Sequence, residues 1–151
     1  MDDKGKIMTS TTALFFYGTL RAAEVRQAVL GTDLPSDQLQ QAMLSGYEVR
    51  RVDGALYPML VARSDGQVNG VLATGLDVTS LFKLDQFEGV HYRRTSLEVN
   101  TVNGPAEADV YLPDQLMVAA ELWDFDSWYK RDMTSFLERE FNLDGVRPPV
   151  R

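Results

Sequence analysis

The stretch LFKLDQFEGVHYRR, residues 81–94, places a carboxylate on the apolar face of a short predicted helix. Leu81 and Leu84 precede Glu88 by seven and four residues, and these spacings put all three on one helical face, with Phe87 beside it. Gly89 is a typical helix-ending residue, so Glu88 lies in the last turn. Burial and the negative end of the helix dipole both disfavour a charged carboxylate there. Such a glutamate has a raised pKa and suits a general base near neutral pH.

The same stretch also allows a purely structural interpretation, in which Glu88 reaches solvent from an untidy helix end. Tyr92 follows where a strand leaves the turn, so it either offers a hydroxyl to a ligand or fills the core. Arg93 either pairs with a carboxylate or is a solvated strand residue, and His91 is interpreted as a surface turn residue. Local sequence leaves both interpretations open.

A second candidate stretch is FFYGTL, residues 15–20, where an apolar strand runs into a glycine and then a helix start. Gly18 lets the backbone approach a ligand closely, and Thr19 is the expected N-cap. The free N–H groups at the start of a helix bind a carboxylate or a phosphate. The structural alternative is a strand–turn–helix junction with no ligand.

Composition removes several function classes. The chain has 15 basic and 22 acidic residues and a net charge of −7, with no dense Lys/Arg cluster, which argues against a nucleic-acid partner. It has no cysteine and one histidine, so thiol catalysis is excluded and a zinc site lacks its usual ligands. No apolar run approaches the ~20 residues that span a membrane. These features predict a cytoplasmic protein without a membrane partner.

The elements that must position these residues indicate an α+β domain. We expect a leader over residues 1–12 and one domain over 13–151. The sequence predicts a buried strand at 13–18, a helix ending at Gly31, and short strands between 41 and 76 with turns at Asp53-Gly54 and Asp65-Gly66. The helix 79–88 and a hairpin turning at Asn103-Gly104 follow.

The last predicted element is an amphipathic helix over 126–141 with Asp126 as its cap. Tyr129, Met133, Phe136 and Leu137 have the spacing of its core face. Few helices and clustered strands predict a small mixed β-barrel or strongly curved sheet with flanking helices. The final residues, LDGVRPPVR, either close over a pocket, pack on a partner or stay loose.

Five segments in a fixed order carry a family resemblance: YGTL at 17–20, YPML at 57–60, VNGVLATGL at 68–76, LDQFEGVHYRR at 84–94 and ADVYL at 108–112. The set resembles the γ-glutamylcyclotransferase-like family, including its plant AIG2-like and γ-glutamylamine cyclotransferase branches. The resemblance covers roughly residues 13–112. It implies a small mixed β-barrel with flanking helices, in agreement with the element pattern.

The resemblance also implies a reaction and a set of site residues. Active members release 5-oxoproline from a small γ-glutamyl amide, as the substrate's own α-amine attacks its γ-carbonyl. Glu88 matches the family's acid/base residue, and no metal, cofactor or nucleophilic side chain is required. Tyr17, Gly18, Thr19 and Leu20 match the loop that holds the γ-glutamyl head, and Tyr92 matches a tyrosine near the pocket. The resemblance assigns Tyr57, Pro58 and Tyr111 to structure and packing.

The sequence departs from the family pattern after YGTL, where RAAEVRQ replaces a common glycine followed by Asn or His. Ala23, Arg26 and Gln27 are therefore expected to alter the pocket wall on the leaving-group side. Two other functions stay open: a non-catalytic module that binds a small carboxylate or amine, and an amide hydrolase or acyltransferase in which Glu88 activates water or an acceptor. A glycosidase is disfavoured because Asp85 is only three residues from Glu88.

Overall fold

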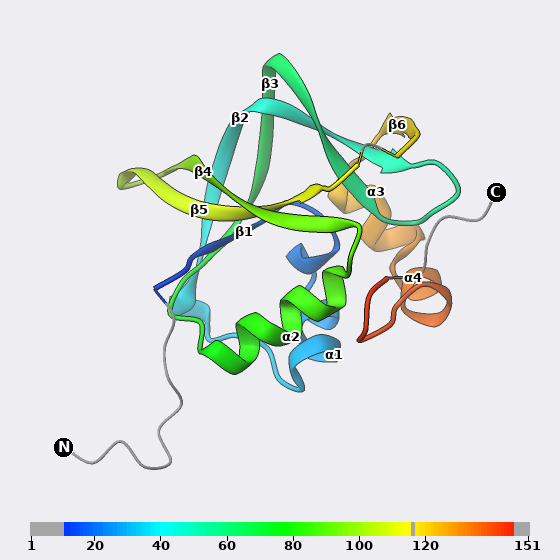
Figure 1. Ribbon diagram of the computed structural model, residues 1–151, viewed down its shortest axis with the longest axis horizontal. Helices are drawn as coiled ribbons and strands as arrows, with labels where there is room; N and C mark the ends of the chain where they lie inside the picture. The colour runs from blue at the N-terminus through cyan, green and yellow to red at the C-terminus, as the bar shows by residue number, and fades with distance from the viewer. Residues whose placement is uncertain (1–10, 116, 147–151) are drawn as a thin grey trace.

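A closed barrel of mixed strands organises the molecule (Figure 1). The computed structural model describes residues 11–115 and 117–146. Its strands, in chain order, are β1 (Leu14–Phe16), β2 (Leu39–Val52), β3 (Pro58–Ala73), β4 (Tyr92–Thr101), β5 (Gly104–Pro113) and β6 (Ala119–Leu122). They are ordered β3-β1-β5-β4-β2-β6, and pairing of β2 with β3 closes the barrel. Because β1 runs parallel to β5 while the other pairs are antiparallel, the predicted mixed barrel is confirmed.

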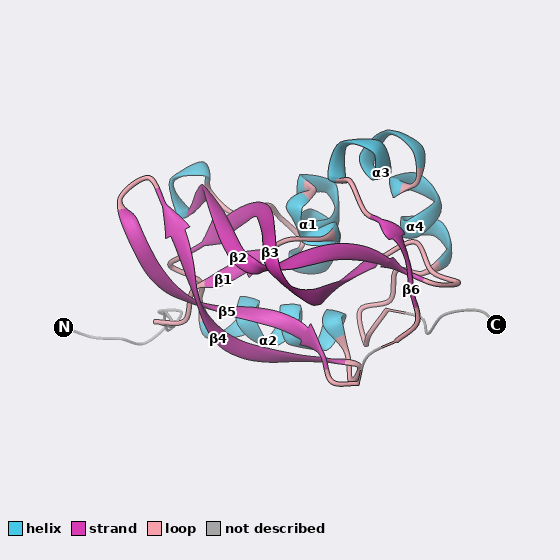
Figure 2. Cartoon of the chain, turned by 90° about the horizontal axis from the view of Figure 1, so that it is seen from above, coloured by secondary structure: helices cyan, strands magenta, loops and turns pink. Residues whose placement is uncertain are grey.

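Helices cover one side and one end of this barrel. The α-helices are α1 (Ala23–Leu30), α2 (Val78–Glu88), α3 (Phe125–Arg131) and α4 (Met133–Arg139), and short 3-10 turns span Thr19–Arg21 and Ser36–Gln38. Helices α1 and α2 lie against each other beneath the barrel, whereas Figure 2 shows α3 and α4 grouped near β6. Among the residues the structure describes, no helix is long and apolar enough to cross a membrane.

Strand β1 is buried on both faces, which explains its unbroken apolar sequence. Phe15 and Tyr17 belong to the apolar cluster inside the barrel, while Leu14 and Phe16 belong to the cluster between the barrel and the helices. Successive side chains of a strand point to opposite faces, so a strand between two cores has no polar face. The loop after β1 therefore emerges where the two cores meet.

The expected turn at Asp65-Gly66 is wrong, because β3 continues through both residues. The ladder between β2 and β3 shifts register between Ser45 and Tyr47. A Cβ at Gly66 would lie 2.2 Å from the Tyr47 carbonyl oxygen. Glycine is needed here because the partner backbone approaches closely at an irregular ladder, and such a site mimics a turn signal in the sequence. The turn expected at Asp53-Gly54 does connect β2 to β3.

Three element boundaries also differ from the predictions. Thr19 begins a 3-10 turn instead of capping α1, whose N-cap is Ala22 with no side-chain hydrogen bond. The hairpin loop is Val102-Asn103, since Gly104 already pairs with Thr101. The C-terminal helix is broken at Asp132 into α3 and α4.

Asp124 caps α3 in place of Asp126, with its carboxylate accepting a hydrogen bond from the Ser127 N–H at 2.9 Å. The break after α3 changes the helical phase, so Trp128 is buried while Tyr129 is exposed. Phe136 is buried as expected, and Met133 and Leu137 pack against the same core. Residues 1–10 of the expected leader lie outside the described residues, as do residues 147–151 of the tail.

Candidate active site

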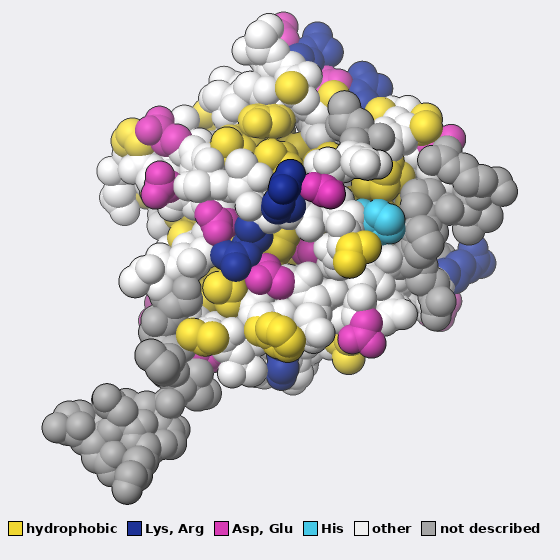
Figure 3. Space-filling view, in the orientation of Figure 1, with side chains coloured by type: hydrophobic (Ala, Val, Ile, Leu, Met, Phe, Trp, Pro, Cys, Tyr) yellow, Lys and Arg dark blue, Asp and Glu magenta, His cyan; other side chains and the backbone are white. Residues whose placement is uncertain are grey.

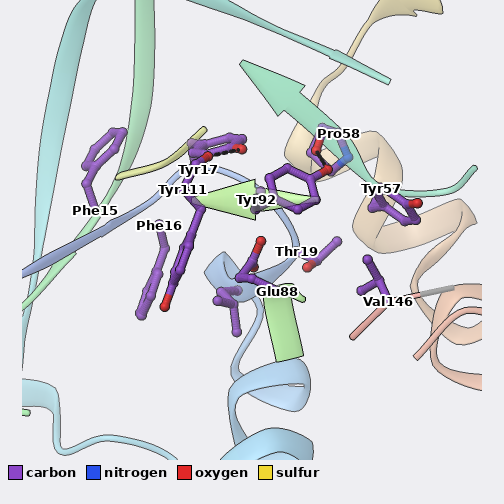
Figure 4. Close-up of a pocket in the computed structure, with 12 residues that line it drawn as sticks. Phe15, Phe16, Tyr17, Thr19, Tyr57, Pro58, Glu88, Tyr92, Tyr111 and Val146 are labelled. Carbon is purple, nitrogen blue, oxygen red and sulfur yellow. Dashed lines mark hydrogen bonds between the residues drawn. The ribbon is translucent and has the colours of Figure 1, made fainter. Parts of the chain in front are cut away.

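One pocket opens between the end of β1, the end of α2 and the start of β3 (Figure 4). Its walls are mainly aromatic and apolar, and they are formed by Phe15, Phe16, Tyr17, Gly18, Thr19, Leu20, Tyr57, Pro58, Glu88, Tyr92, Tyr111 and Val146. The structure thus brings together all six residues that the sequence assigned to a site.

The loop of Tyr17, Gly18, Thr19 and Leu20 forms one wall. Gly18 has a negative φ of −118°, and close packing favours glycine at this position. A Cβ there would lie 3.0 Å from the Pro58 ring, at the head of β3. The Arg21 N–H donates to the Gly18 carbonyl at 3.0 Å and closes the 3-10 turn. The first N–H groups of such a turn have no partner within it, so they remain available to an anionic or carbonyl oxygen.

Glu88 is the last residue of α2 and is held there by the apolar face that the sequence predicted. Leu84 and Phe87 are fully buried, and Leu81 packs against the same cluster. Asp77 caps the start of the helix by accepting a hydrogen bond from the Ser80 N–H at 2.6 Å. Gly89 ends it with φ +79°. The Glu88 residue as a whole is partly exposed, but its carboxyl points into the pocket below the Tyr92 ring (Figure 4).

Burial is the main influence on the Glu88 carboxyl and raises its pKa to about 8. The second cause is the negative charge of Asp85, one helical turn earlier, which sequence reasoning did not consider. No described residue forms a salt bridge with Glu88. The arrangement therefore makes Glu88 a far stronger base than an ordinary glutamate, whose pKa is about 4.3.

Asp85 is itself fixed by partners from two barrel strands. Its Oδ1 lies 2.9 Å from Arg94 Nε on β4 and accepts a hydrogen bond from the Tyr111 hydroxyl of β5 at 2.7 Å. Arg94 also pairs with Asp109 at 2.8 Å. These contacts tie α2 to the barrel and keep a fixed negative charge near Glu88. Tyr111, which the resemblance assigned to packing, thus both lines the pocket and orients Asp85.

Two buried tyrosines donate their hydroxyl protons to main-chain carbonyls. The Tyr17 hydroxyl donates to the Tyr111 carbonyl at 2.7 Å, and the Tyr92 hydroxyl donates to the Pro58 carbonyl at 3.0 Å. Burial and the nearby negative groups raise the pKa of both phenols, so they remain neutral. A phenol oxygen whose proton is engaged still accepts hydrogen bonds. The Tyr92 oxygen is therefore suited to a cationic donor such as an ammonium group.

Arg26 does not line the pocket, contrary to the expectation from the RAAEVRQ departure. It is buried and pairs with Asp33 at 2.7 Å, while its Nη1 donates to the carbonyls of Leu20 and Arg21, both at 2.9 Å. Arg26 thus fastens the Tyr17–Leu20 loop from behind. A cationic side chain on a helix gives no sequence signal for this role, because its partners are carbonyls of a turn formed by a separate element.

Two residues in the candidate stretch lie outside the pocket, and the pocket also contains residues that the sequence had not assigned to a site. Arg93 is exposed and pairs with Asp114 at 3.0 Å, and His91 is exposed as expected. Tyr57, expected as structural, lines the pocket and meets the Tyr92 ring edge-on at 6.4 Å. Val146 belongs to the final segment, for which closure over a pocket was one of three alternatives, and among its described residues Val146 does line the pocket.

Charged side chains on the visible face are mixed, with basic groups next to acidic ones (Figure 3). Ion pairs in the structure include Arg94 with Asp85 and Arg93 with Asp114. Within residues 11–115 and 117–146, no group of three or more His, Asp or Glu side chains is arranged to hold a metal ion.

Comparison with known proteins finds a matching family and similar plant proteins. A family model described as gamma-glutamyl cyclotransferase, AIG2-like, matches residues 14–130. AIG2-like protein C of Arabidopsis thaliana is 32% identical over 82% of this chain and 73% of its own length. Protein AIG2 C of the same plant is 31% identical over 83% of this chain and 76% of its own length.

Solved structures share the fold. An Arabidopsis thaliana protein solved in solution is 26% identical, with a TM-score of 0.66, over 88% of this chain and 81% of its own. A chain described as gamma-glutamyl cyclotransferase is 14% identical, with a TM-score of 0.59, over 93% of this chain and 90% of its own. At that identity the second likeness concerns the fold alone.

Proposed function

Because this chain belongs to the gamma-glutamyl cyclotransferase, AIG2-like family, we propose that it releases 5-oxoproline and a free amine from a small γ-glutamyl amide, with Glu88 as general acid and base. The observation that carries the proposal is the Glu88 carboxyl, directed into a pocket lined by the Tyr17–Leu20 loop with its pKa raised to about 8. The further prediction of a cytoplasmic protein without nucleic-acid or membrane partners rests on the sequence.

The reaction begins with a proton transfer for which Glu88 is matched. An α-ammonium group has an ordinary pKa of about 8 and cannot attack while protonated. Transfer of its proton to a carboxylate whose pKa is also about 8 is nearly balanced, whereas transfer to an ordinary glutamate is uphill by several pKa units. An ammonium group entering the pocket favours the charged carboxylate, so binding prepares the base.

Ring closure then needs no group beyond the substrate and Glu88. The neutral α-nitrogen forms a bond to the γ-carbonyl carbon. The carbon–nitrogen bond to the leaving amine breaks as Glu88 gives the departing nitrogen the proton that it took from the ammonium group. Glu88 then accepts the second proton that the ring nitrogen loses and passes it to the free amine. The products are 5-oxoproline and the amine, and no water is consumed. Holding amine and carbonyl together contributes up to about 7–11 kcal/mol in ideal intramolecular cases.

The remaining pocket residues are suited to positioning the substrate. The N–H groups of the Thr19–Arg21 turn support binding of the α-carboxylate or of the carbonyl oxygen that gains charge during attack. The hydroxyl oxygen of Tyr92 supports binding of the α-ammonium group, since its proton is already donated to the Pro58 carbonyl.

The test is mass-spectrometric detection of 5-oxoproline from γ-glutamyl amino acids, γ-glutamyl amines and γ-glutamyl-lysine. Wild type should form it, and Glu88→Gln should not, although its fold is retained. The matched control is Glu48→Gln, a surface glutamate outside the pocket. Free glutamate in place of 5-oxoproline would identify a hydrolase. Thermal stabilisation by a panel compound without product would identify a binding module.

A further inference from the structure

The segment 133–146, which consists of α4 and the turn after it, contacts the pocket although it lies beyond the family match at residue 130. Val146 lines the pocket and is buried. In Figure 4, Val146 and Tyr57 lie together on one side of Glu88, while Phe16 and Tyr111 lie on the other. We call residues 133–146 the C-terminal segment.

The C-terminal segment first holds the end of the helix that carries Glu88. The Val146 N–H donates to the Phe87 carbonyl at 3.0 Å and so satisfies one of the carbonyls that a helix end leaves free. The Phe87 ring packs on Phe141 with centroids 5.4 Å apart. A Cβ at Gly89 would lie 3.0 Å from Gly145 Cα, so the two backbones are in direct contact. Any displacement of Gly145 is therefore transmitted to the turn after Glu88.

Residues of α3 and of the C-terminal segment also hold the start of β3, which forms the rest of this wall. A Glu140 Oε1 accepts a hydrogen bond from the Leu56 N–H at 2.8 Å. Trp128 of α3 donates its indole N–H to the Leu56 carbonyl at 2.7 Å. Both polar groups of the Leu56 residue are thus fixed, immediately before Tyr57 and Pro58 of the pocket. Glu140 is a positioning residue in this arrangement, because it acts through Leu56.

We propose that the C-terminal segment determines which leaving amine this chain accepts, with Val146 as the specificity-determining wall and Glu140 and Gly145 as positioning residues. This inference rests on the proposed function. In this proposal the Tyr17–Leu20 loop holds the γ-glutamyl head beside Glu88, and the leaving amine lies against the side that Tyr57 and Val146 form, next to Thr19 (Figure 4). That side is apolar and aromatic, which suits an amine with an alkyl or aromatic body.

The first experiment varies the size of this wall. γ-Glutamyl methylamide, butylamide and benzylamide are compared as substrates of wild type and Val146→Phe. The larger side chain should lower kcat/KM for the benzylamide at least about tenfold relative to the methylamide, as expected when pocket volume is lost. Val102→Phe is the control, since Val102 is 90% exposed in the hairpin turn. An unchanged benzylamide-to-methylamide ratio in Val146→Phe would overturn the proposal.

The second experiment separates positioning from folding. Glu140→Leu should lower kcat/KM about tenfold to a hundredfold, because small displacements of pocket groups are costly. Glu140→Gln should restore it, since the amide oxygen still accepts from Leu56. Gly145→Ala should lower kcat/KM, whereas Gly104→Ala, with a similar positive φ and open space around it, should only lower stability. Equal losses in the two alanine variants, or no rescue by glutamine, would contradict a positioning role.

The outcomes distinguish the inference from the function on which it rests. If wild type forms no 5-oxoproline from the three amides or from the panel that tests the proposed function, the proposed function fails. If wild type forms it but the Val146→Phe, Glu140→Leu and Gly145→Ala variants retain the wild-type size preference and rate, the function stands and the inference fails.

Discussion

Glu88 and Glu48 are the same side chain in two regions that change its acidity in opposite directions. At Glu88, burial and the nearby Asp85 raise the pKa to about 8. At Glu48, on the barrel surface, hydrogen bonds from Arg50 and Arg63 lower the pKa. The difference shows that Glu88 is a strong base because its carboxyl is buried and pairs with no cation of the described residues. Arg94, the nearby cation, is instead engaged by Asp85 and Asp109.

The largest expected effect is on turnover. Glu88→Gln should lower the rate of 5-oxoproline formation by about 10²–10⁴-fold, the usual contribution of general acid–base catalysis. Glu48→Gln should leave the rate unchanged, because Glu48 lies outside the pocket. Steady-state kinetics by mass spectrometry measures both. A Glu88→Gln enzyme as fast as wild type would contradict the role of Glu88 as general acid and base, since its raised pKa would then serve no catalytic purpose.

The second prediction concerns stability and pH. A carboxyl whose folded pKa is raised from 4.5 to about 8 binds its proton more tightly when folded, so stability falls as pH rises between these values. The loss amounts to about 3–5 kcal/mol by pH 9. Glu88→Gln should remove it, so the variant should be more stable than wild type at pH 9 and similar at pH 5.

Glu48 should show the opposite sign. Its lowered folded pKa contributes stability that is present above about pH 4.5 and is lost as pH falls further. Urea unfolding of wild type, Glu88→Gln and Glu48→Gln at pH 4, 5, 7 and 9 tests both signs. Parallel pH profiles for wild type and Glu88→Gln would contradict the raised pKa of Glu88.

The third prediction extends the comparison from carboxylates to arginines. Arg26→Met leaves the Leu20 and Arg21 carbonyls and Asp33 without their partner, and should lower the free energy of unfolding by about 2–4 kcal/mol. It should also raise KM, because the Tyr17–Leu20 loop loses its support. Arg63→Met, which breaks exposed pairs, should cost less than about 1 kcal/mol. Similar losses of unfolding free energy in Arg26→Met and Arg63→Met, measured by urea unfolding, would contradict the role of Arg26 in fastening the loop.

The smallest expected effect is a shift in the pH–rate profile. Asp85→Asn removes one of the two causes of the raised Glu88 pKa, so the pKa should fall from about 8 but stay above its ordinary value because burial remains. The acid limb of kcat/KM should move to lower pH, since the ionised base is then present at lower pH. An unshifted limb would assign the raised pKa to burial alone.

Several features of the fold and the site followed from local sequence. The apolar run of β1 and the spacing of Leu81, Leu84 and Glu88 depend on periodicities over one or two turns, and the structure has both as predicted. Two other features differ from the sequence predictions, because tertiary contacts override an ambiguous local signal. Gly66 marks a close approach to Tyr47 and not a turn, and α3 ends before the amphipathic pattern does.

The sequence by itself determined that Glu88 would lie on the apolar face at the end of a helix, and that the Tyr17–Leu20 loop would follow a buried strand. The tertiary structure alone decided what surrounds them. Asp85 is fixed by Arg94 and Tyr111, the loop is fastened by Arg26, and the wall is completed by Val146, 58 positions after Glu88 in the chain. Local propensity acts over a few residues, whereas a pKa and a pocket wall depend on groups that only closure of the barrel and docking of the C-terminal segment bring within contact distance.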